Sequence, residues 1–264
     1  MNGRIVRSIS ALLGGGLLVA AVLPGRAIVA PASSVGRTSP TTYGSGLAAV
    51  REPGGLGWYS SNWAGYALAR GTYRSVSGQW TIPAVSAAAG SGFSALWIGV
   101  DGFGNASLIQ TGTEADVYGG RTHYSAWWEI LPSPAVTIRG LAVRPGDRIT
   151  ASIARVATGR WRITIRDSRS GGYSTTRSYG GPGTSAEWIE EAPVVLRHST
   201  SLAVHGRVVF DNVKANGVDP HLRASEGGAM IRRGMIVDIP SAPDADGNGF
   251  ALVEQITAPT RPAS

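Results

Sequence analysis

The chain has no cysteine among its 264 residues, which excludes disulfide bonds, thiolate metal ligands and a cysteine nucleophile. Charged residues are also scarce, at 16% of the sequence. Three catalytic motifs are missing: the Gly-x-Ser-x-Gly elbow, His-Glu-x-x-His, and a doubled Asp-Thr-Gly or Asp-Ser-Gly. Their absence argues against the common serine hydrolases, zinc proteases and paired-aspartate proteases.

The sequence also lacks an apolar run long enough for a membrane anchor, because the run over residues 9–23 is shorter than the roughly 20 apolar residues of a spanning helix. Arg4 and Arg7 precede this run, and the small residues 24–27 follow it. This order is typical of a signal peptide. We therefore predict that residues 1–27 are a signal peptide and that the protein is secreted.

Residues 28–57 are rich in Pro, Ser, Gly and Ala, so we predict a disordered linker or pro-segment there. Residues 58–264 are then long enough for one domain with a sizeable core. The leader holds five arginines and one glutamate, so the net charge of +7 leaves only about +3 on this domain. No basic run is interleaved with aromatic residues, which argues against a nucleic-acid partner. We expect a monomer that binds no nucleic acid and has no membrane anchor.

The domain reads as short strands separated by Gly, Pro, Asn and Asp, with no sustained apolar stripe of helical spacing. A hairpin is predicted around Ala157 to Gly159. The even spacing without crossover helices predicts an all-β domain of antiparallel sheets, packed as a sandwich or a barrel. The predicted strands cover residues 75–83, 94–102, 106–112, 122–131, 147–156, 160–168, 207–215 and 234–240.

The segment AEWIEE at residues 186–191 places three carboxylates beside a tryptophan. In a strand, Glu187 and Glu191 share one face and Glu190 takes the other, so the three cannot all face solvent. A carboxyl that shares a face with Ile or Trp is paired, hydrogen-bonded or raised in pKa. The alternative is an edge strand whose charges discourage aggregation.

Few residues of the sequence are arranged as metal ligands. The four histidines show no metal-binding spacing and are expected at the surface or in loops. Residues 244–249, DADGNG, match the first half of a calcium loop, but Gln255 stands where a glutamate should be, so we predict a turn. What remains is a set of carboxylates and Gln110, which alternation places with Leu108 on one strand face. Water activation by a carboxylate partnered by an amide or a second acid is the chemistry that this inventory supports.

Six motifs follow one another from about Trp58 onward: SSNWAGY (60–66), SVSGQWTIP (75–83), WIGVDG (97–102), LIQTG (108–112), YSAWWE (124–129) and AEWIEE (186–191). In these motifs and their order the sequence resembles the glutamic peptidases called eqolisins. The resemblance implies a β-sandwich of two bent antiparallel sheets, concanavalin-like, and a secreted endopeptidase that acts on polypeptides in acid without metal or cofactor. The chain departs from the fungal members in lacking cysteine and in having Ser125 where they have an aspartate.

The resemblance also implies roles for single residues. Gln110 and Glu191 fall at the positions of the family's catalytic glutamine and glutamate. Glu191 would activate water and Gln110 would stabilise the oxyanion. A second, protonated group is needed for the loss of activity at higher pH, and Glu129 and Asp101 are the candidates. The predicted substrate-binding residues, at the walls or floor of the cleft, are Trp63, Trp97, Asp101, Trp127 and Glu129.

Two other functions fit the same residues. In a β-sandwich glycoside hydrolase, Glu129 and Glu191 would form the acid and nucleophile pair, and the tryptophans would stack on sugar rings. This hypothesis gives Gln110 no use. A carbohydrate-binding module without catalysis is the third possibility, and it would keep its sugar affinity when these residues are substituted.

Overall fold

A computed structural model describes residues 55–195, 198–254 and 258–264. The predicted signal peptide over 1–27 and nearly all of the predicted linker over 28–57 lie outside these residues. None of the helices among the described residues has the length and apolar character to cross a membrane; they are two 3₁₀ turns, η1 (Ala87–Ala89) and η2 (Ala224–Glu226).

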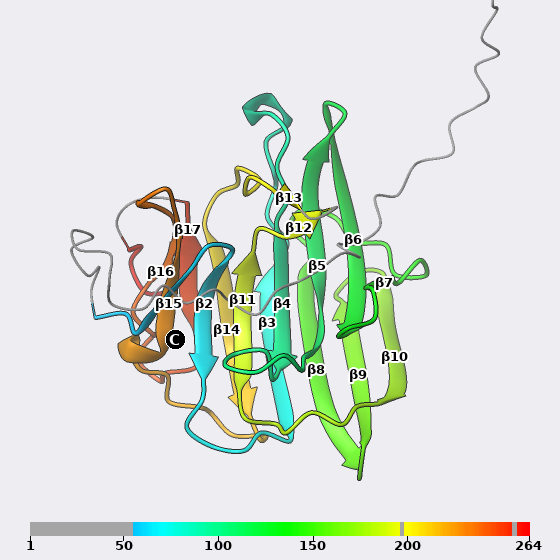
Figure 1. Ribbon diagram of the computed structural model, residues 1–264. Coiled ribbons are helices and arrows are strands. Elements are labelled where there is room, and N and C mark those ends of the chain that lie inside the picture. The colour runs from blue at the N-terminus through cyan, green and yellow to red at the C-terminus, as the bar shows by residue number, and fades with distance from the viewer. Residues whose placement is uncertain (1–54, 196–197, 255–257) are drawn as a thin grey trace, which may run out of the picture. The chain divides into compact units, whose positions relative to one another are not determined.

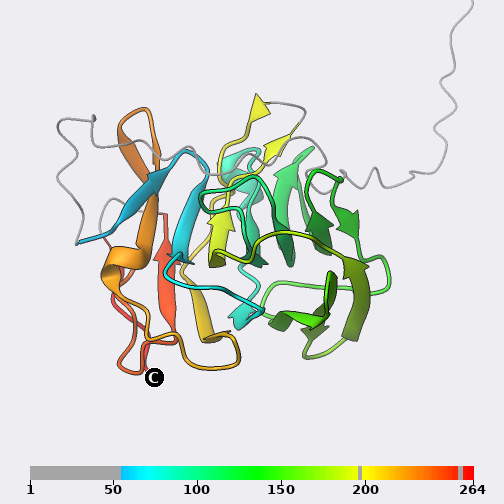
Figure 2. The same cartoon turned by 60° about the horizontal axis from the view of Figure 1, so that its bottom comes forward.

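The rest of the described secondary structure is strand, and nearly all of it is antiparallel (Figures 1 and 2). The first sheet contains β1 (Trp58–Ser60), β15 (Gly227–Arg232), β2 (Trp63–Leu68), β11 (Ala186–Glu191), β4 (Ala95–Val100), β5 (Ile109–Tyr118), β6 (Arg121–Ile130) and β7 (Val136–Thr137). The second contains β10 (Gly171–Ser178), β9 (Arg160–Asp167), β8 (Arg148–Ala157), β3 (Ser75–Thr81), β14 (Val208–Ala215) and β17 (Phe250–Val253). A separate pair is formed by β12 (Val194–Val195) and β13 (His198–Ser199).

The strand β16 (Met235–Pro240) belongs to both sheets, because it pairs with β15 on one side and with β17 on the other. The two sheets are therefore one continuous hydrogen-bonded ladder that folds back on itself and closes over a shared core. This confirms the predicted antiparallel β-sandwich.

Each of the eight predicted strand segments overlaps a strand, although the segment 106–112 covers only the beginning of β5, which continues to Tyr118. The predicted hairpin is also confirmed, since Ala157 pairs with Arg160 and Gly159 takes a positive φ of 65° in the turn. Residues 244–249 form the predicted turn, in which the Asn248 N–H donates to Asp244. The edge-strand alternative for β11 is wrong, because β11 pairs with β2 along one side and β4 along the other.

Alternation along β11 is confirmed and explains the unbroken burial of its six residues. Ala186 and Trp188 belong to the core cluster between the sheets, where the Trp188 indole N–H donates to the Ser77 carbonyl at 2.8 Å. Ile189 belongs to a second apolar cluster, on the opposite face of the first sheet. Both faces of this strand are covered, so none of its three carboxylates reaches solvent.

Glu190 points into the core beside His205, whose side chain is also buried, in contrast to the expected surface position. The His205 Nε2 lies 2.5 Å from a Glu190 carboxyl oxygen, and the Ser94 hydroxyl donates to the same oxygen at 2.8 Å. Burial alone would lower the pKa of His205, but the Glu190 charge raises it to about 10. Burial raises the pKa of the neighbouring Asp238 well above its usual range, and Glu190 adds to this. The core therefore holds one ion pair and one neutral acid.

This ion pair predicts how stability depends on pH. The folded pKa of His205 lies above its ordinary value of 6.5, so the pair contributes fully below that pH and loses its contribution as pH rises through about 10. We expect His205→Gln to lower the free energy of unfolding by about 3–5 kcal/mol in acid, because Glu190 is left buried and unpaired. The stability of the variant should also not decline as pH rises from 6.5 to about 10, whereas the stability of the wild type should.

Denaturant unfolding followed across this pH range checks the prediction. His221→Asn is the matched control, because His221 is exposed and has a positive φ that asparagine tolerates. A wild-type curve that stays flat between neutral pH and pH 10 would contradict a buried imidazolium.

Candidate active site

The candidate site lies on the face of the first sheet that is turned away from the core cluster, called the site face below. Strand pairing arranges its residues in three rows that run across β2, β11, β4, β5 and β6 (Figure 1). The first row is Ala67, Glu187, Gly99, Gln110 and Glu129; the second is Gly65, Ile189, Trp97, Gly112 and Trp127; the third is Trp63, Glu191, Ala95, Glu114 and Ser125.

Glu191, in the third row, is fully buried, and both of its carboxyl oxygens accept hydrogen bonds. The Trp97 indole N–H donates to Oε2 at 3.0 Å, and the Asn62 amide donates to Oε1 at 3.3 Å. The Ser60 hydroxyl donates to the Asn62 carbonyl oxygen at 3.1 Å, which turns the Asn62 N–H groups toward the carboxyl. Two N–H donors favour the charged form of a carboxyl and hold it in one orientation.

Gln110, in the first row, is fully buried and bonded through its nitrogen. Its Nε2 donates to a Glu129 carboxyl oxygen at 2.6 Å. Its Oε1 has no hydrogen-bond partner among the described residues. The hydrogen bond to Glu129 identifies the nitrogen of the Gln110 side-chain amide. The second N–H and the carbonyl oxygen of this amide are then available to another molecule.

Trp97 lies between the rows of these two side chains. Its indole nitrogen reaches Glu191, and the far edge of its ring lies over Gly99, where a Cβ would come within 2.8 Å of the ring. Gly112, opposite Trp97 on β5, has no room for a side chain: a Cβ there would lie 2.2 Å from the Leu96 carbonyl oxygen. These two glycines let the strands and the indole approach closely enough to set the carboxylate and the amide on one surface.

Glu187 shares the first row with Gln110 and is separated from it by Gly99. Its carboxyl is fully buried, and neither oxygen makes a hydrogen bond of normal geometry with a described residue. Burial raises the pKa of Glu187 well above its usual range; contacts with Ser185 and the Phe103 backbone oppose this only in part. Glu187 therefore keeps its proton above the pH at which an ordinary glutamate ionises.

Asp101, at the end of β4, is also buried but is surrounded by donors. The Tyr179 hydroxyl donates to it at 2.7 Å, and the backbone N–H groups of Gly183 and Thr184 each donate at 2.9 Å. Asn105 contributes a fourth donor at 3.1 Å. Asp101 thereby ties the loop after β4 to the segment before β11, and its predicted contact with substrate stays a prediction.

The three predicted cleft tryptophans, Trp63, Trp97 and Trp127, are all fully buried in the apolar cluster on the site face. Trp63 and Trp97 meet edge to face, with their ring centroids 4.8 Å apart. Trp58 and Phe103 pack against the same cluster. The structure thus gathers every predicted site residue on or beside one sheet face, where the three tryptophans are buried in one apolar cluster.

Sequence reasoning missed two parts of this site. Asn62 stands in the quoted motif SSNWAGY, but nothing in the sequence shows that its amide reaches a strand 129 positions away. The raised pKa of Glu187 depends on its complete burial with few donors nearby, which only the structure reveals.

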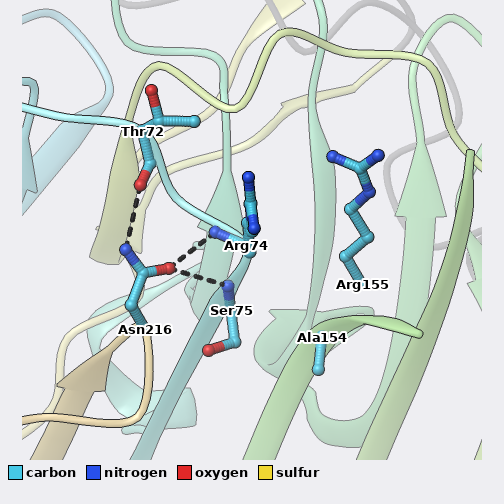
Figure 3. Close-up of a pocket in the computed structure, with 6 residues that line it drawn as sticks. All are labelled: Thr72, Arg74, Ser75, Ala154, Arg155 and Asn216. Carbon is cyan, nitrogen blue, oxygen red and sulfur yellow. Dashed lines mark hydrogen bonds between the residues drawn. The ribbon is translucent and has the colours of Figure 1, made fainter. Parts of the chain in front are cut away.

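An open hollow of about 550 Å³ lies elsewhere, at the ends of β3 and β8 (Figure 3). Asn216 closes one side of it: its carbonyl oxygen accepts from the backbone N–H groups of Arg74 and Ser75, and its amide donates to Thr72. Arg155 lines the opposite side. None of the carboxylates of the site face lines this hollow.

Fold and site together define a β-sandwich protein with a buried carboxylate and a buried carboxamide on one sheet face. The model of the Peptidase A4 family matches residues 61–237, which is more than half of the sequence. The chain belongs to the Peptidase A4 family, and its motif resemblance to the glutamic peptidases is confirmed.

Known proteins agree with this assignment. Aspergillopepsin-2 from Aspergillus niger is 29% identical over 183 residues, which span 60% of this chain and 64% of that protein. The match therefore covers less than two thirds of that relative's length. A scytalido-glutamic peptidase, solved with a transition state analog inhibitor, superposes with a TM-score of 0.60 at 21% identity, over 74% of this chain and 98% of that one. Aspergilloglutamic peptidase from Aspergillus niger superposes with a TM-score of 0.51 at 22% identity, over 62% and 99%. Both structures share the fold.

Close strand packing at Gly112 is testable without any assay of function. We expect Gly112→Ala to lower the free energy of unfolding by about 2 kcal/mol or more, because the added methyl meets backbone atoms of β4 that cannot move independently. Gly140→Ala is the control: Gly140 is exposed, with no atom within 4 Å of an added Cβ, so its effect should stay within about 0.5 kcal/mol. Equal stabilities in denaturant unfolding would contradict the described approach of β4 and β5.

Proposed function

We propose that this protein is a secreted endopeptidase that hydrolyses polypeptides in acid with Glu191 and Gln110, without metal or cofactor. One observation carries the proposal: a buried carboxylate held by two N–H donors shares a sheet face with a buried amide whose carbonyl oxygen and second N–H are uncommitted. Membership of the Peptidase A4 family supports it.

In the proposed reaction, the Glu191 carboxylate takes a proton from a water molecule held between it and Gln110. The water oxygen attacks the carbonyl carbon of the peptide bond, and the carbonyl electron pair moves onto oxygen. The free N–H of Gln110 donates to this oxyanion as it forms. Glu191 then gives its proton to the amine nitrogen, the C–N bond breaks and the carbonyl forms again, so that one carboxyl serves as base and then as acid.

The neighbouring residues support these two roles. The N–H groups of Trp97 and Asn62 keep the Glu191 carboxyl ionised and oriented toward one side. Glu129 holds the Gln110 amide so that it cannot rotate and exchange its nitrogen and oxygen. Positioned donors of this kind need no reorganisation when charge develops during the reaction, which is where an enclosed site gains most of its rate enhancement.

The same contact bears on the glycoside hydrolase hypothesis. There, Glu129 would be an acid or nucleophile facing the sugar, and Gln110 would have no task. In the structure Gln110 donates to Glu129, which makes the amide part of the site. Secretion and a monomeric state stay predictions, as does the sequence-based assignment of the tryptophans to substrate binding.

Single substitutions of the pair test the proposal. We expect Gln110→Ala to lower kcat on an unfolded protein substrate in acid by about 10²–10³-fold, the usual cost of losing an oxyanion donor. Glu191→Gln should lower kcat by about 10²–10⁴-fold, because the water loses its base. Wild-type activity should also fall at the lowest pH, as Glu191 becomes protonated.

Matched controls are Gln79→Ala and Glu226→Gln, which change the same residue types away from the site face and should keep wild-type kinetics. All variants are compared by circular dichroism to show that they fold. Full activity in either Gln110→Ala or Glu191→Gln would remove the proposed mechanism. If the wild-type enzyme instead cleaved glycosides, with Glu129→Gln and Glu191→Gln equally inactive, the glycosidase hypothesis would replace it.

A further inference from the structure

The proposed mechanism needs one more group. An enzyme whose base must be ionised loses activity in strong acid, but a loss of activity at higher pH requires a different group that must stay protonated. The sequence offers Glu129 and Asp101 for this role. Glu129 accepts a hydrogen bond from the Gln110 amide, and Asp101 accepts from four residues. Both carboxyl groups are therefore already committed to holding a neighbouring group in place.

Glu187 has the opposite surroundings. It occupies the same row as Gln110 and Glu129, its side chain is fully buried, and its oxygens lack hydrogen-bond partners of normal geometry among the described residues. A Cβ built on Gly99 would lie 3.3 Å from one of its oxygens and 2.8 Å from the ring of Trp97. The Glu187 carboxyl and the Trp97 ring therefore converge over Gly99, directly beside Gln110.

The charged groups around Glu187 do not favour its ionisation. Asp101 lies close enough to raise the pKa of Glu187 further, after the larger effect of burial. Tyr179 and Tyr73 face it from neighbouring segments; burial is the main cause of their raised pKa values, and the Glu187 carboxyl is a lesser one. Neither tyrosine supplies a positive charge, and none of the electrostatic neighbours of Glu187 among the described residues is a cation.

We propose that Glu187, as the neutral acid, is a positioning residue of the site, and that its ionisation ends activity at higher pH. This inference rests on the proposed function. The residue does not touch the reacting atoms: it acts through Trp97, which holds Glu191, and through the row that it shares with Gln110.

Ionisation of Glu187 would harm both partners for simple electrostatic reasons. A buried negative charge in the row of Gln110 opposes the oxyanion that the Gln110 N–H must stabilise, and little solvent is present to screen it. A carboxylate without donors also draws in water or moves to find it. Entry of water or movement of the carboxylate would disturb the packing over Gly99, and with it the Trp97 indole that orients Glu191. The neutral form of Glu187 neither opposes the oxyanion nor disturbs this packing.

The test compares kcat as a function of pH for the wild-type full-length protein and Glu187→Gln, with an unfolded protein substrate. Glutamine keeps the shape of the neutral acid but cannot ionise. In the wild type we expect kcat to fall by about tenfold per pH unit beyond the ionisation. In Glu187→Gln, kcat in acid should be retained. The decline of kcat at higher pH should shift to a still higher pH or vanish. An unchanged decline in the folded variant would overturn the proposal.

Three further variants discriminate among the carboxyl groups. Glu129→Gln and Asp101→Asn should keep the wild-type decline at higher pH, whatever their effect on the maximal rate. Glu114→Gln, on the same face and two strands from β11, is the matched control and should keep it as well. If removing Glu129 or Asp101 abolishes the decline instead, that residue is the protonated group and Glu187 is not. Glu187→Met, also neutral and of similar length, replaces the glutamine variant if the latter does not fold.

A spectroscopic measurement separates this inference from the proposed function. A buried neutral carboxyl gives a C=O stretching band in the infrared. We expect such a band in the wild type above the pH at which an ordinary glutamate ionises, and we expect it to be missing from Glu187→Gln. The bands of Asp238 and Glu254, two other carboxyls of raised pKa, are identified with Asp238→Asn and Glu254→Gln. If the protein has no peptidase activity, the proposed function fails while this band still reports the state of Glu187. If the Glu187 band is absent, or disappears in a different pH range from activity, the inference fails.

Discussion

The pairing of β11 on both of its sides is the constraint on which the rest of the site depends. The strand is bonded to β2 and β4 along its edges, and a different apolar cluster covers each of its faces, so its three glutamates enter three different buried environments. Glu190 meets a cation in the core, Glu191 meets two N–H donors, and Glu187 meets almost no donor at all. The same residue type is thus an ion-pair partner, an acceptor of two N–H bonds and a carboxyl of raised pKa within five positions, because the strand presents each one to different neighbours.

These environments determine how stability depends on pH. A carboxyl whose pKa is raised on folding binds its proton more tightly in the folded state, so its contribution to stability is lost as pH rises through the folded pKa. The pKa values of Glu187 and Asp238 are raised in this way, and His205 loses its contribution as pH rises through about 10. For Glu190, burial is the largest single effect and raises the pKa, but the His205 charge and the hydrogen bonds together lower it, so its contribution has the opposite sign and is lost as pH falls.

Local patterns predicted most of the longer strands, including β4, which is buried on both faces, but they missed β2 and β15. The strand β2, WAGYAL, has no polar residue to mark its period, and β15 begins with two glycines, so neither shows a strand pattern. For the site, the motif resemblance located Gln110, Glu191 and the tryptophans. It could not reveal that Gln110 bonds Glu129, or that His205 is buried, because these contacts join residues 19 and 15 positions apart through folding rather than through sequence pattern.

The shared strand β16 has one more consequence. Because it joins the two sheets into a single ladder, the main path of strands has only two outer members, β10 and β7, with β1 added beside β15. A chain that adds to the edge of a sheet needs free backbone N–H and C=O groups, and a strand bonded on both sides offers none. On the path of strands that the structure describes, such groups are therefore left mainly at the outer strands. This closure of the backbone edges comes from strand connectivity, in a sequence that has no cysteine to form a disulfide.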